Sequence, residues 1–238
     1  MQQRATIGLI GGMSWESSAE YYRIINQEMQ RRVGGVHSAR SLMWSVDFGE
    51  IEHLQHAGEW DRLADEMKDA ARRLEGGGAD FIVLCTNTMH RLAGAIVEAV
   101  GIPLLHIADP TAVKIKKAGF ERVGLLGTAF TMEQDFYKGR LQDRHGLTVI
   151  VPDDADRRIV HDVIYKELVV GQIRPESRQA YREIMTRLRE RGAQAIILGC
   201  TEIMLLVSEE DSPAPLFDTT TIHALAAVDL ALGSEPMA

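Results

Sequence analysis

Cysteine is scarce in this sequence: its 238 residues contain only two, Cys85 and Cys200. Two cysteines without a close spacing build neither a disulfide framework nor a zinc site, because both need several sulfur or nitrogen groups at short intervals. Lysines are few as well, and none lies in a context typical of a Schiff base, so the sequence does not indicate pyridoxal phosphate. We therefore expect no cofactor and no metal.

Long apolar runs and an excess of positive charge are also missing. No stretch approaches 18 consecutive apolar residues, so we expect no membrane span. The 26 basic and 34 acidic residues give a net charge of −8, which argues against nucleic acid or an anionic membrane surface as the main partner. The first residues lead directly into a strand pattern without the apolar segment of a signal peptide. These absences predict a soluble, cytoplasmic protein.

Short β-branched runs alternate with longer amphipathic segments, which is the pattern of an α/β protein. Strands are expected at Thr6–Ile10, Leu42–Val46, Phe81–Leu84, Leu104–Ile107, Arg122–Leu126, Thr148–Val151, Ala195–Leu198 and Leu216–Phe217. Helical patterns lie between them, for example over residues 17–33, 58–76, 133–146 and 176–192, and several end in glycine, as helices often do.

The eight strands divide into two similar sets of four. The segment IGLIGG at residues 7–12 corresponds to VGLLGT at 123–128, an offset of 116 (123 − 7), and the two cysteines are 115 positions apart (200 − 85). The segment HIADPT corresponds in the same way to LFDTTT near the end of the chain. Shared landmarks of this kind indicate a duplicated half. The sequence therefore predicts two pseudo-symmetric, doubly wound (flavodoxin-like) α/β domains with parallel sheets.

The two predicted domains divide the chain unequally. The first comprises residues 1–100 together with 214–238, whose elements return to it, and the second comprises residues 101–213. No Ser/Gly-rich linker marks a boundary, which indicates short crossovers. Because such sheets bind ligands at the carboxyl ends of their strands, we expect the active site in the cleft between the two domains.

Both cysteines directly follow an apolar strand pattern, at the end where doubly wound sheets place their sites. Each precedes threonines suited to cap the next helix, Thr86 or Thr88 in the first half and Thr201 in the second. A helix N-terminus stabilises a thiolate, which lowers its pKa, and it also binds carboxylates. An isolated cysteine at a strand end is more often a small core residue, but equivalent cysteines in two halves favour a function.

Two thiols on opposite faces of one ligand suit proton exchange at a carbon next to a carboxylate. One thiolate removes the proton from one face, and the opposite thiol returns a proton to the other face. For the mirror-image substrate the two roles are exchanged. A single base could not do this unless the substrate turned over, so Cys85 and Cys200 are the predicted catalytic residues.

Further candidates lie in the loops that follow the first strand of each half. In the loop Gly11–Ser14, Met13 and Ser14 are predicted to contact the ligand, although a tight turn that requires glycine explains the loop equally well. Thr128 and Thr131 occupy the equivalent loop of the second half, where helix capping accounts for one of them. The first loop is not G-x-G-x-x-G, so a dinucleotide site is not indicated.

Three ionisable residues near these loops have two interpretations each. His90 and His223 lie within helical patterns that follow ligand-edge loops, where a packed or solvated imidazole is more common than one that polarises a thiol. Glu202 lies in the first turn of a helix, where the helix dipole favours a carboxylate in any case. The sequence leaves open the roles of these residues and of Lys166.

Five motifs together resemble the aspartate/glutamate racemase family, most closely its broad-specificity amino-acid racemases: IGLIGGMSWESSAEYYRIIN, LCTNTMH, LLGTAFTMEQDFYKGRL, GCTEI and FDTTTIHA. The resemblance covers nearly the whole chain, and the paired CTNT and GCTE motifs are specific. It implies a pyridoxal-phosphate-independent racemase of two domains, usually a homodimer, with Cys85 and Cys200 as its acid/base residues. It also implies that four polar residues hold the substrate's carboxylate and amine: Thr86, Asn87, Thr88 and Thr201.

The sequence departs from the acid-selective members of that family at two positions. Those members carry an arginine just after the second strand, where this chain has VDFGEIEH with Asp47 and Glu50. A second cationic position falls on Val169, three residues from Lys166. We therefore expect a neutral or hydroxylated substrate side chain at least as readily as an acidic one.

Two alternatives to an amino-acid racemase stay open. The first is another enzyme of the same fold with a cysteine pair, of the hydantoin racemase, maleate isomerase or decarboxylase type. The second is a non-catalytic protein that binds a small carboxylate between two α/β lobes. The second cysteine argues against the binding protein, because a clamp has no use for thiols on both faces.

Overall fold

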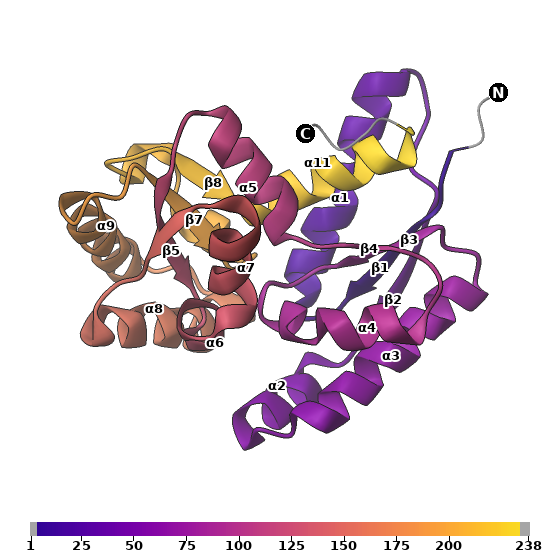
Figure 1. The fold of residues 1–238 in the computed structure, drawn as a ribbon, viewed down its shortest axis with the longest axis horizontal. Coiled ribbons are helices and arrows are strands. Elements are labelled where there is room, and N and C mark those ends of the chain that lie inside the picture. Colours follow the sequence, from indigo (N-terminus) through magenta and orange to yellow (C-terminus); the bar gives the residue numbers. More distant parts are fainter. Residues whose placement is uncertain (1–3, 234–238) are drawn as a thin grey trace. The chain divides into compact units, whose positions relative to one another are not determined.

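The computed structural model describes residues 4–233, which form two compact α/β units (Figure 1). Unit 1 comprises the chain up to Ile107 and returns at His223, and unit 2 comprises Ala108–Ile222. Each unit contains one four-stranded sheet in which all strands are parallel. The predicted pair of α/β domains with parallel sheets is therefore confirmed.

In unit 1 the strand order is β2-β1-β3-β4. Its elements are β1 (Ile7–Gly11), α1 (Trp15–Val33), β2 (Ser41–Ser45), α2 (Phe48–Ala57), α3 (Trp60–Gly76), β3 (Phe81–Leu84), the 3₁₀ helix η1 (Thr88–Leu92), α4 (Ala93–Ala99), β4 (Leu104–Leu105) and the larger part of α11 (Thr219–Ala231). The expected strands all form, and their ends differ from the predictions by at most two residues.

In unit 2 the strand order is β6-β5-β7-β8, which repeats that of unit 1. Its elements are α5 (Ala108–Lys117), β5 (Arg122–Gly127), α6 (Ala129–Glu133), α7 (Asp135–His145), β6 (Thr148–Ile150), α8 (Asp154–Lys166), η2 (Leu168–Val170), α9 (Pro175–Glu190), β7 (Ala195–Gly199), α10 (Ile203–Leu206), η3 (Glu209–Asp211) and β8 (Leu216–Asp218). In both units the chain order reverses between the two central strands, which is the switch point where doubly wound sheets bind ligands.

The last strand of each sheet determines where one unit ends and the other begins. β4 pairs with β3 and so stays in unit 1, and β8 pairs with β7 and so stays in unit 2. The chain therefore changes unit after Ile107 and Ile222, whereas the sequence predicted changes after residues 100 and 213. The difference arises because both strands are short, and only their pairing shows to which sheet each belongs.

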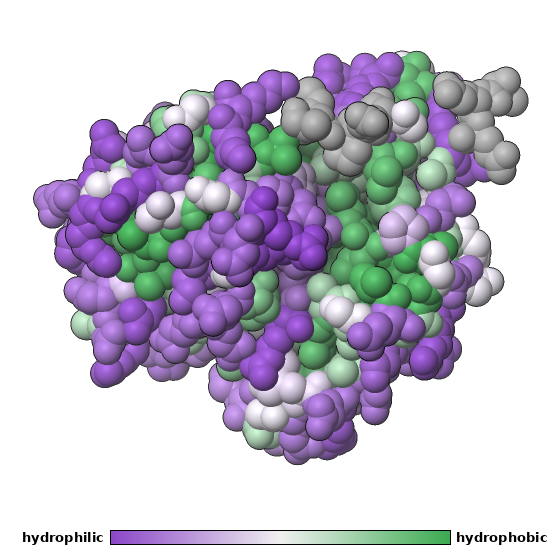
Figure 2. Space-filling model, in the orientation of Figure 1, coloured by the Kyte–Doolittle hydropathy of each residue, from purple (hydrophilic) through white to green (hydrophobic). Residues whose placement is uncertain are grey.

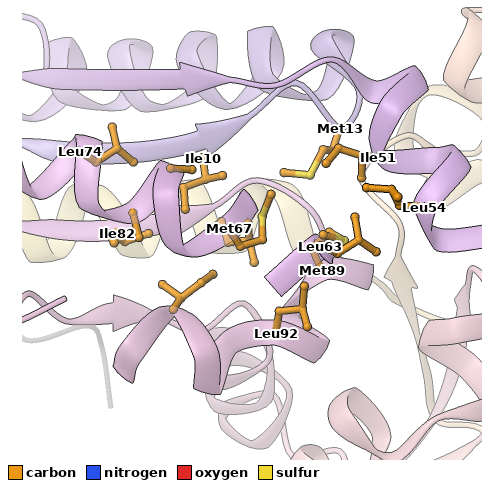
Figure 3. Packing of buried hydrophobic residues seen from close by; sticks show 14 of the residues in the cluster. Ile10, Met13, Ile51, Leu54, Leu63, Met67, Leu74, Ile82, Met89 and Leu92 are labelled. Carbon is orange, nitrogen blue, oxygen red and sulfur yellow. The ribbon is translucent and has the colours of Figure 1, made fainter. Parts of the chain in front are cut away.

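Residues of β3 alternate between two hydrophobic cores on the two faces of the sheet. Ile82 and Leu84 pack into the cluster that α2, α3 and η1 complete (Figure 3). Phe81, Val83 and then Cys85 belong to the cluster formed with α1 and α11. Successive residues of a strand point to opposite faces, so this alternation directs Cys85 toward the side of α1 and α11.

The surface is consistent with the composition. The face drawn in Figure 2 is largely hydrophilic, with apolar side chains gathered in patches. Within residues 4–233, no helix is both long enough and apolar enough to cross a membrane.

Gly12, the residue directly after β1, allows a stability prediction. Gly12 has φ +90°, and a Cβ on it would lie 2.2 Å from the Val46 carbonyl oxygen; Gly78 has φ +92° with nothing within 4 Å. Gly78→Ala should lose about 1–2 kcal/mol of unfolding free energy from the left-handed backbone alone. Gly12→Ala should lose about 1–3 kcal/mol more through overpacking. Urea unfolding measures both, and equal losses would contradict the close approach to Val46.

Candidate active site

In unit 1 the loop after β1 and the turn after β3 are neighbours at the carboxyl edge of the sheet. Ile10 pairs with Leu84, and the Cys85 N–H donates to the Ile10 carbonyl at 2.9 Å. This bond extends the hydrogen-bond ladder between β1 and β3 by one residue, so Cys85 lies directly after the paired part of the two strands. The predicted catalytic cysteine of this half therefore lies at the switch point of its sheet.

Cys85 is a fully buried, free thiol. Its Sγ lies 3.8 Å from the Val83 carbonyl oxygen, and the Ser17 hydroxyl donates to the Cys85 carbonyl at 3.4 Å. Burial raises the pKa of the Cys85 thiol well above its ordinary value, because a thiolate would lose its hydration there. The thiol is accordingly held in its protonated form at neutral pH.

The polar residues that follow Cys85 are buried beside it. Thr86, Asn87 and Thr88 are each less than 10% exposed. The Thr86 N–H donates to the Leu84 carbonyl at 2.9 Å, which closes a tight turn around Cys85. The expected capping by Thr86 or Thr88 is wrong: η1 is short, its N-cap is Asn87, and the Asn87 side chain makes no capping hydrogen bond.

The two candidates in the first loop have different surroundings. The Ser14 hydroxyl caps α1 by accepting from the Ser17 N–H at 3.3 Å. The Met13 side chain is 4% exposed and lies in the core beside Ile51 and Leu54 (Figure 3). The Met13 side chain thus packs in the hydrophobic core of unit 1.

Cys200 occupies the corresponding position in unit 2, directly after β7. It is a buried free thiol whose Sγ donates to Glu202 Oε2 at 3.0 Å. The Thr201 hydroxyl donates to the same oxygen at 2.8 Å, and Glu202 is 2% exposed. Burial, and then the neighbouring Glu202 carboxylate, raise the pKa of Cys200 well above its ordinary value. Glu202, which the sequence placed in the first turn of a helix, is instead the N-cap residue of α10 and a hydrogen-bond partner of the thiol.

The loop after β5 adjoins this cysteine, because Gly127 pairs with Gly199. The Thr128 hydroxyl caps α6 by accepting from the Thr131 N–H at 3.3 Å, and the two hydroxyl oxygens are 3.2 Å apart. Both threonines are buried. Helix capping therefore accounts for the threonine at position 128. Because the loop adjoins the end of β7, Thr128 and Thr131 also lie at the carboxyl edge of the sheet of unit 2.

The predicted lowering of the cysteine pKa values is wrong, because the pKa of both thiols is raised. η1 is a 3₁₀ helix of five residues, and α10 has only four. The N-cap of α10 is Glu202 rather than Thr201, and it makes no side-chain cap. Backbone N–H groups of Glu202 and Thr201 do lower the pKa of Cys200, but burial and the Glu202 carboxylate outweigh them, and burial alone raises the pKa of Cys85.

Asp47 and Lys166, considered above for recognition of the substrate's side chain, are both engaged in other interactions. Asp47 caps α2 by accepting from the Gly49 N–H at 2.8 Å. Lys166 pairs with Asp162 at 2.9 Å, and both side chains are more than half exposed. Among residues 4–233, no group of three or more His, Cys, Asp or Glu side chains could hold a metal ion.

Sequence reasoning missed two side chains near Cys85. Ser17, on α1, reaches the Cys85 carbonyl, and His106, directly after β4, packs its ring 4.5 Å from the ring of His90. His106 could have been found from its place at the carboxyl end of a strand. Ser17 could not, because its partner lies 68 positions away.

Comparison with known proteins agrees with this geometry. The model of the family described as Asp/Glu/Hydantoin racemase matches residues 10–227. The broad specificity amino-acid racemase RacX of Bacillus subtilis (strain 168) is 29% identical over 230 residues, which cover 93% of this chain and 96% of that protein. A candidate Asp/Glu racemase from Yersinia pestis is 55% identical with a TM-score of 0.89, and an aspartate racemase homologue from Pyrococcus horikoshii OT3 is 31% identical with a TM-score of 0.80. Each of these two matches covers 96% of this chain and 99% of the other. The chain belongs to the Asp/Glu/Hydantoin racemase family and is an enzyme of the isomerase class.

Proposed function

We propose that this chain is an amino-acid racemase that works without a cofactor and uses Cys85 and Cys200 as its two acid/base groups. The observation that carries the proposal is topological. In each unit a buried free cysteine directly follows the corresponding central strand, β3 in unit 1 and β7 in unit 2. Both thiols act on the Cα of one bound amino acid. Each enantiomer then has its own proton-abstracting group, as inversion at carbon requires.

The elevated pKa of both thiols shapes the proposed proton cycle. Glu202 accepts the proton of Cys200, with which it already shares a hydrogen bond. The resulting Cys200 thiolate takes the Cα proton of one enantiomer, and the Cys85 thiol gives its proton to the opposite face of the carbanion. The enzyme is left with a Cys200 thiol and a Cys85 thiolate, which is the form that accepts the other enantiomer. One negative charge has moved between the two sulfurs, and no proton is lost or gained.

The polar groups beside the thiols supply the substrate contacts in this proposal. Side-chain amide and hydroxyl groups, together with backbone N–H groups at the strand ends, bind the α-carboxylate and the α-amine. Support comes from their burial at the two switch points. The residues are those predicted from the sequence: Ser14, Thr86, Asn87, Thr88, Thr128, Thr131 and Thr201, with Met13 through its backbone alone.

Homodimer formation and a cytoplasmic location belong to the same proposal and stay predictions. The large apolar side chains exposed on unit 1 include Trp15, Tyr22, Met43 and Trp44. Two of them, Met43 and Trp44, lie on β2, an edge strand of its sheet. An exposed apolar edge strand is a surface that proteins usually cover.

Single replacement of either cysteine by serine tests the two-base proposal. Cys85→Ser and Cys200→Ser keep the shape of the side chain but supply a far weaker base. Racemisation in both directions should fall by about 10²–10⁴-fold or more, since every turnover needs both groups. Substrate binding, measured by calorimetry, should change little. Each variant should still exchange the Cα proton of one enantiomer with heavy water, and the two variants should differ in which one.

Near-normal racemisation by either variant would contradict the two-base proposal. The corresponding cysteine would then be a small residue that packs at a strand end. Loss of substrate binding in both variants would instead indicate that the thiols hold the ligand without reacting.

Replacement of Glu202 separates two effects of this residue: its effect on the pKa of the Cys200 thiol and its proposed role as proton acceptor. The Glu202 carboxylate raises the pKa of Cys200, so Glu202→Gln should lower that pKa and speed alkylation of Cys200 by iodoacetamide at pH 7. A carboxamide cannot take the thiol proton, so racemisation should nevertheless slow by about 10²-fold or more. Glu167→Gln is the matched control, because Glu167 is a largely buried carboxylate bonded to Ser177 at 2.6 Å.

Faster racemisation by Glu202→Gln would contradict the proton-acceptor role and leave the carboxylate as an obstacle to thiolate formation. Unchanged alkylation of Cys200 would contradict the bond between the two side chains.

The surroundings of Asp47 and Lys166 generate a prediction about the substrate. Asp47 is engaged in a helix cap, and Lys166 is paired with Asp162 at an exposed site, so neither is set to bind a substrate carboxylate. A neutral or hydroxylated amino acid should be racemised at least as fast as aspartate. Deuterium uptake at Cα from heavy water, followed across the common amino acids and a 5-substituted hydantoin, measures this. Activity with aspartate or glutamate alone would refute it.

A further inference from the structure

His90 is buried in unit 1, and both nitrogens of its ring are engaged. Nε2 lies 3.1 Å from the Ile107 backbone nitrogen, and Nδ1 lies 2.7 Å from the Thr86 carbonyl oxygen. A backbone N–H can only donate, so Nε2 accepts and carries no proton. A carbonyl oxygen can only accept, so Nδ1 carries the proton. The two partners therefore define one neutral tautomer of His90.

The Thr86 carbonyl completes a set of bonds that fixes the turn around Cys85. The Cys85 N–H donates to the Ile10 carbonyl, and the Thr86 N–H donates to the Leu84 carbonyl, each at 2.9 Å. The Ser17 hydroxyl reaches the Cys85 carbonyl. The Cys85 thiol packs among apolar side chains, and within residues 4–233 its polar contact is a long one, 3.8 Å to the Val83 carbonyl oxygen. The position of this thiol is thus determined through its backbone, and His90 secures the side of the turn that follows it.

The ring also connects this turn to the end of β4. Ile107 is the last residue of unit 1 before the chain enters unit 2. Two further imidazoles line the same region: His106 is 4.5 Å and His223 is 5.9 Å from the His90 ring centroid. His223 bonds to the Leu105 carbonyl at 2.9 Å and to the Tyr21 hydroxyl at 2.8 Å. Buried imidazoles thus tie β4 both to the Cys85 turn and to α1.

We propose that His90 is a positioning residue for Cys85: as the neutral Nδ1–H tautomer, it holds the Thr86 carbonyl and thereby aims the thiol. The competing interpretation is a packed histidine that contributes to stability alone. The proposal rests on the proposed catalytic role of Cys85 for its kinetic consequence. Its structural part, the placement of the thiol, does not depend on that role.

Two amide variants separate the two hydrogen bonds of the ring. An asparagine amide group occupies the place of Nδ1, so His90→Asn keeps a donor for the Thr86 carbonyl and loses the Ile107 bond. A glutamine amide group occupies the place of Nε2, so His90→Gln keeps an acceptor for Ile107 and loses the Thr86 bond. Each variant loses one hydrogen bond, so their melting temperatures should fall by similar amounts.

Their kinetics should differ. His90→Asn should keep kcat within about threefold of the wild type, whereas His90→Gln should lower kcat by about 10²-fold with KM little changed, since misplacing a reacting group by about 1 Å costs that much. His56→Gln is the matched control, because His56 makes the same bond to a carbonyl four residues earlier, Glu52, on an exposed helix. It should leave kcat unchanged. Equal kcat losses in the two His90 variants, or a larger loss in His90→Asn, would overturn the proposal.

Labelling of the thiols tests the role of His90 independently of the racemase proposal. His90→Gln should increase iodoacetamide labelling of Cys85 relative to Cys200, read by peptide mass spectrometry, while His90→Asn and His56→Gln should not. This readout holds whether or not the chain racemises an amino acid. If both His90 variants fail to fold, ¹⁵N NMR of the wild-type histidines decides: a buried neutral ring with the proton on Nδ1 is expected, and its absence would overturn the assignment.

Discussion

The hydrogen bond from the Cys85 N–H to the Ile10 carbonyl closes the central strand pair of unit 1 at its carboxyl end. In unit 2 the corresponding strand pair ends where Gly127 pairs with Gly199, one residue before Cys200. The register of the two central strands therefore places both thiols. A slip by one residue would turn either thiol to the opposite face of its sheet, so the position of each thiol depends on the pairing of the backbone.

The two halves hold their thiols by different means. In unit 1 the backbone around Cys85 is bonded on both sides, and the sulfur has only a long contact with a carbonyl. In unit 2 the sulfur of Cys200 is itself bonded, to the Glu202 carboxylate. Burial raises the pKa of both thiols, and the carboxylate adds to the shift for Cys200 alone. The two similar units thus hold their thiols in different hydrogen-bond surroundings.

Burial of a thiol and use of that thiol as a base make opposite demands. A thiolate at neutral pH requires a stabilising charge or a nearby proton acceptor. Backbone N–H groups of Thr201 and Glu202 lower the pKa of Cys200, but burial and the Glu202 carboxylate outweigh them. In the mechanism proposed above, Glu202, which accepts a hydrogen bond from the Cys200 thiol, is that proton acceptor. In that mechanism the thiolate forms during turnover, because burial favours the protonated form of both thiols.

The sequence by itself determined the eight strands, the internal repeat and the place of Cys85 and Cys200 at strand ends, because β-branched runs and terminal glycines are local signals. Tertiary structure alone decided the direction of the thiol pKa shifts, the assignment of β4 and β8 to their sheets, and the tautomer of His90. Each of these depends on hydration lost in packing or on partners distant along the chain. Strand formation follows local composition, but the proton affinity of a buried group follows whatever the fold brings within hydrogen-bond reach.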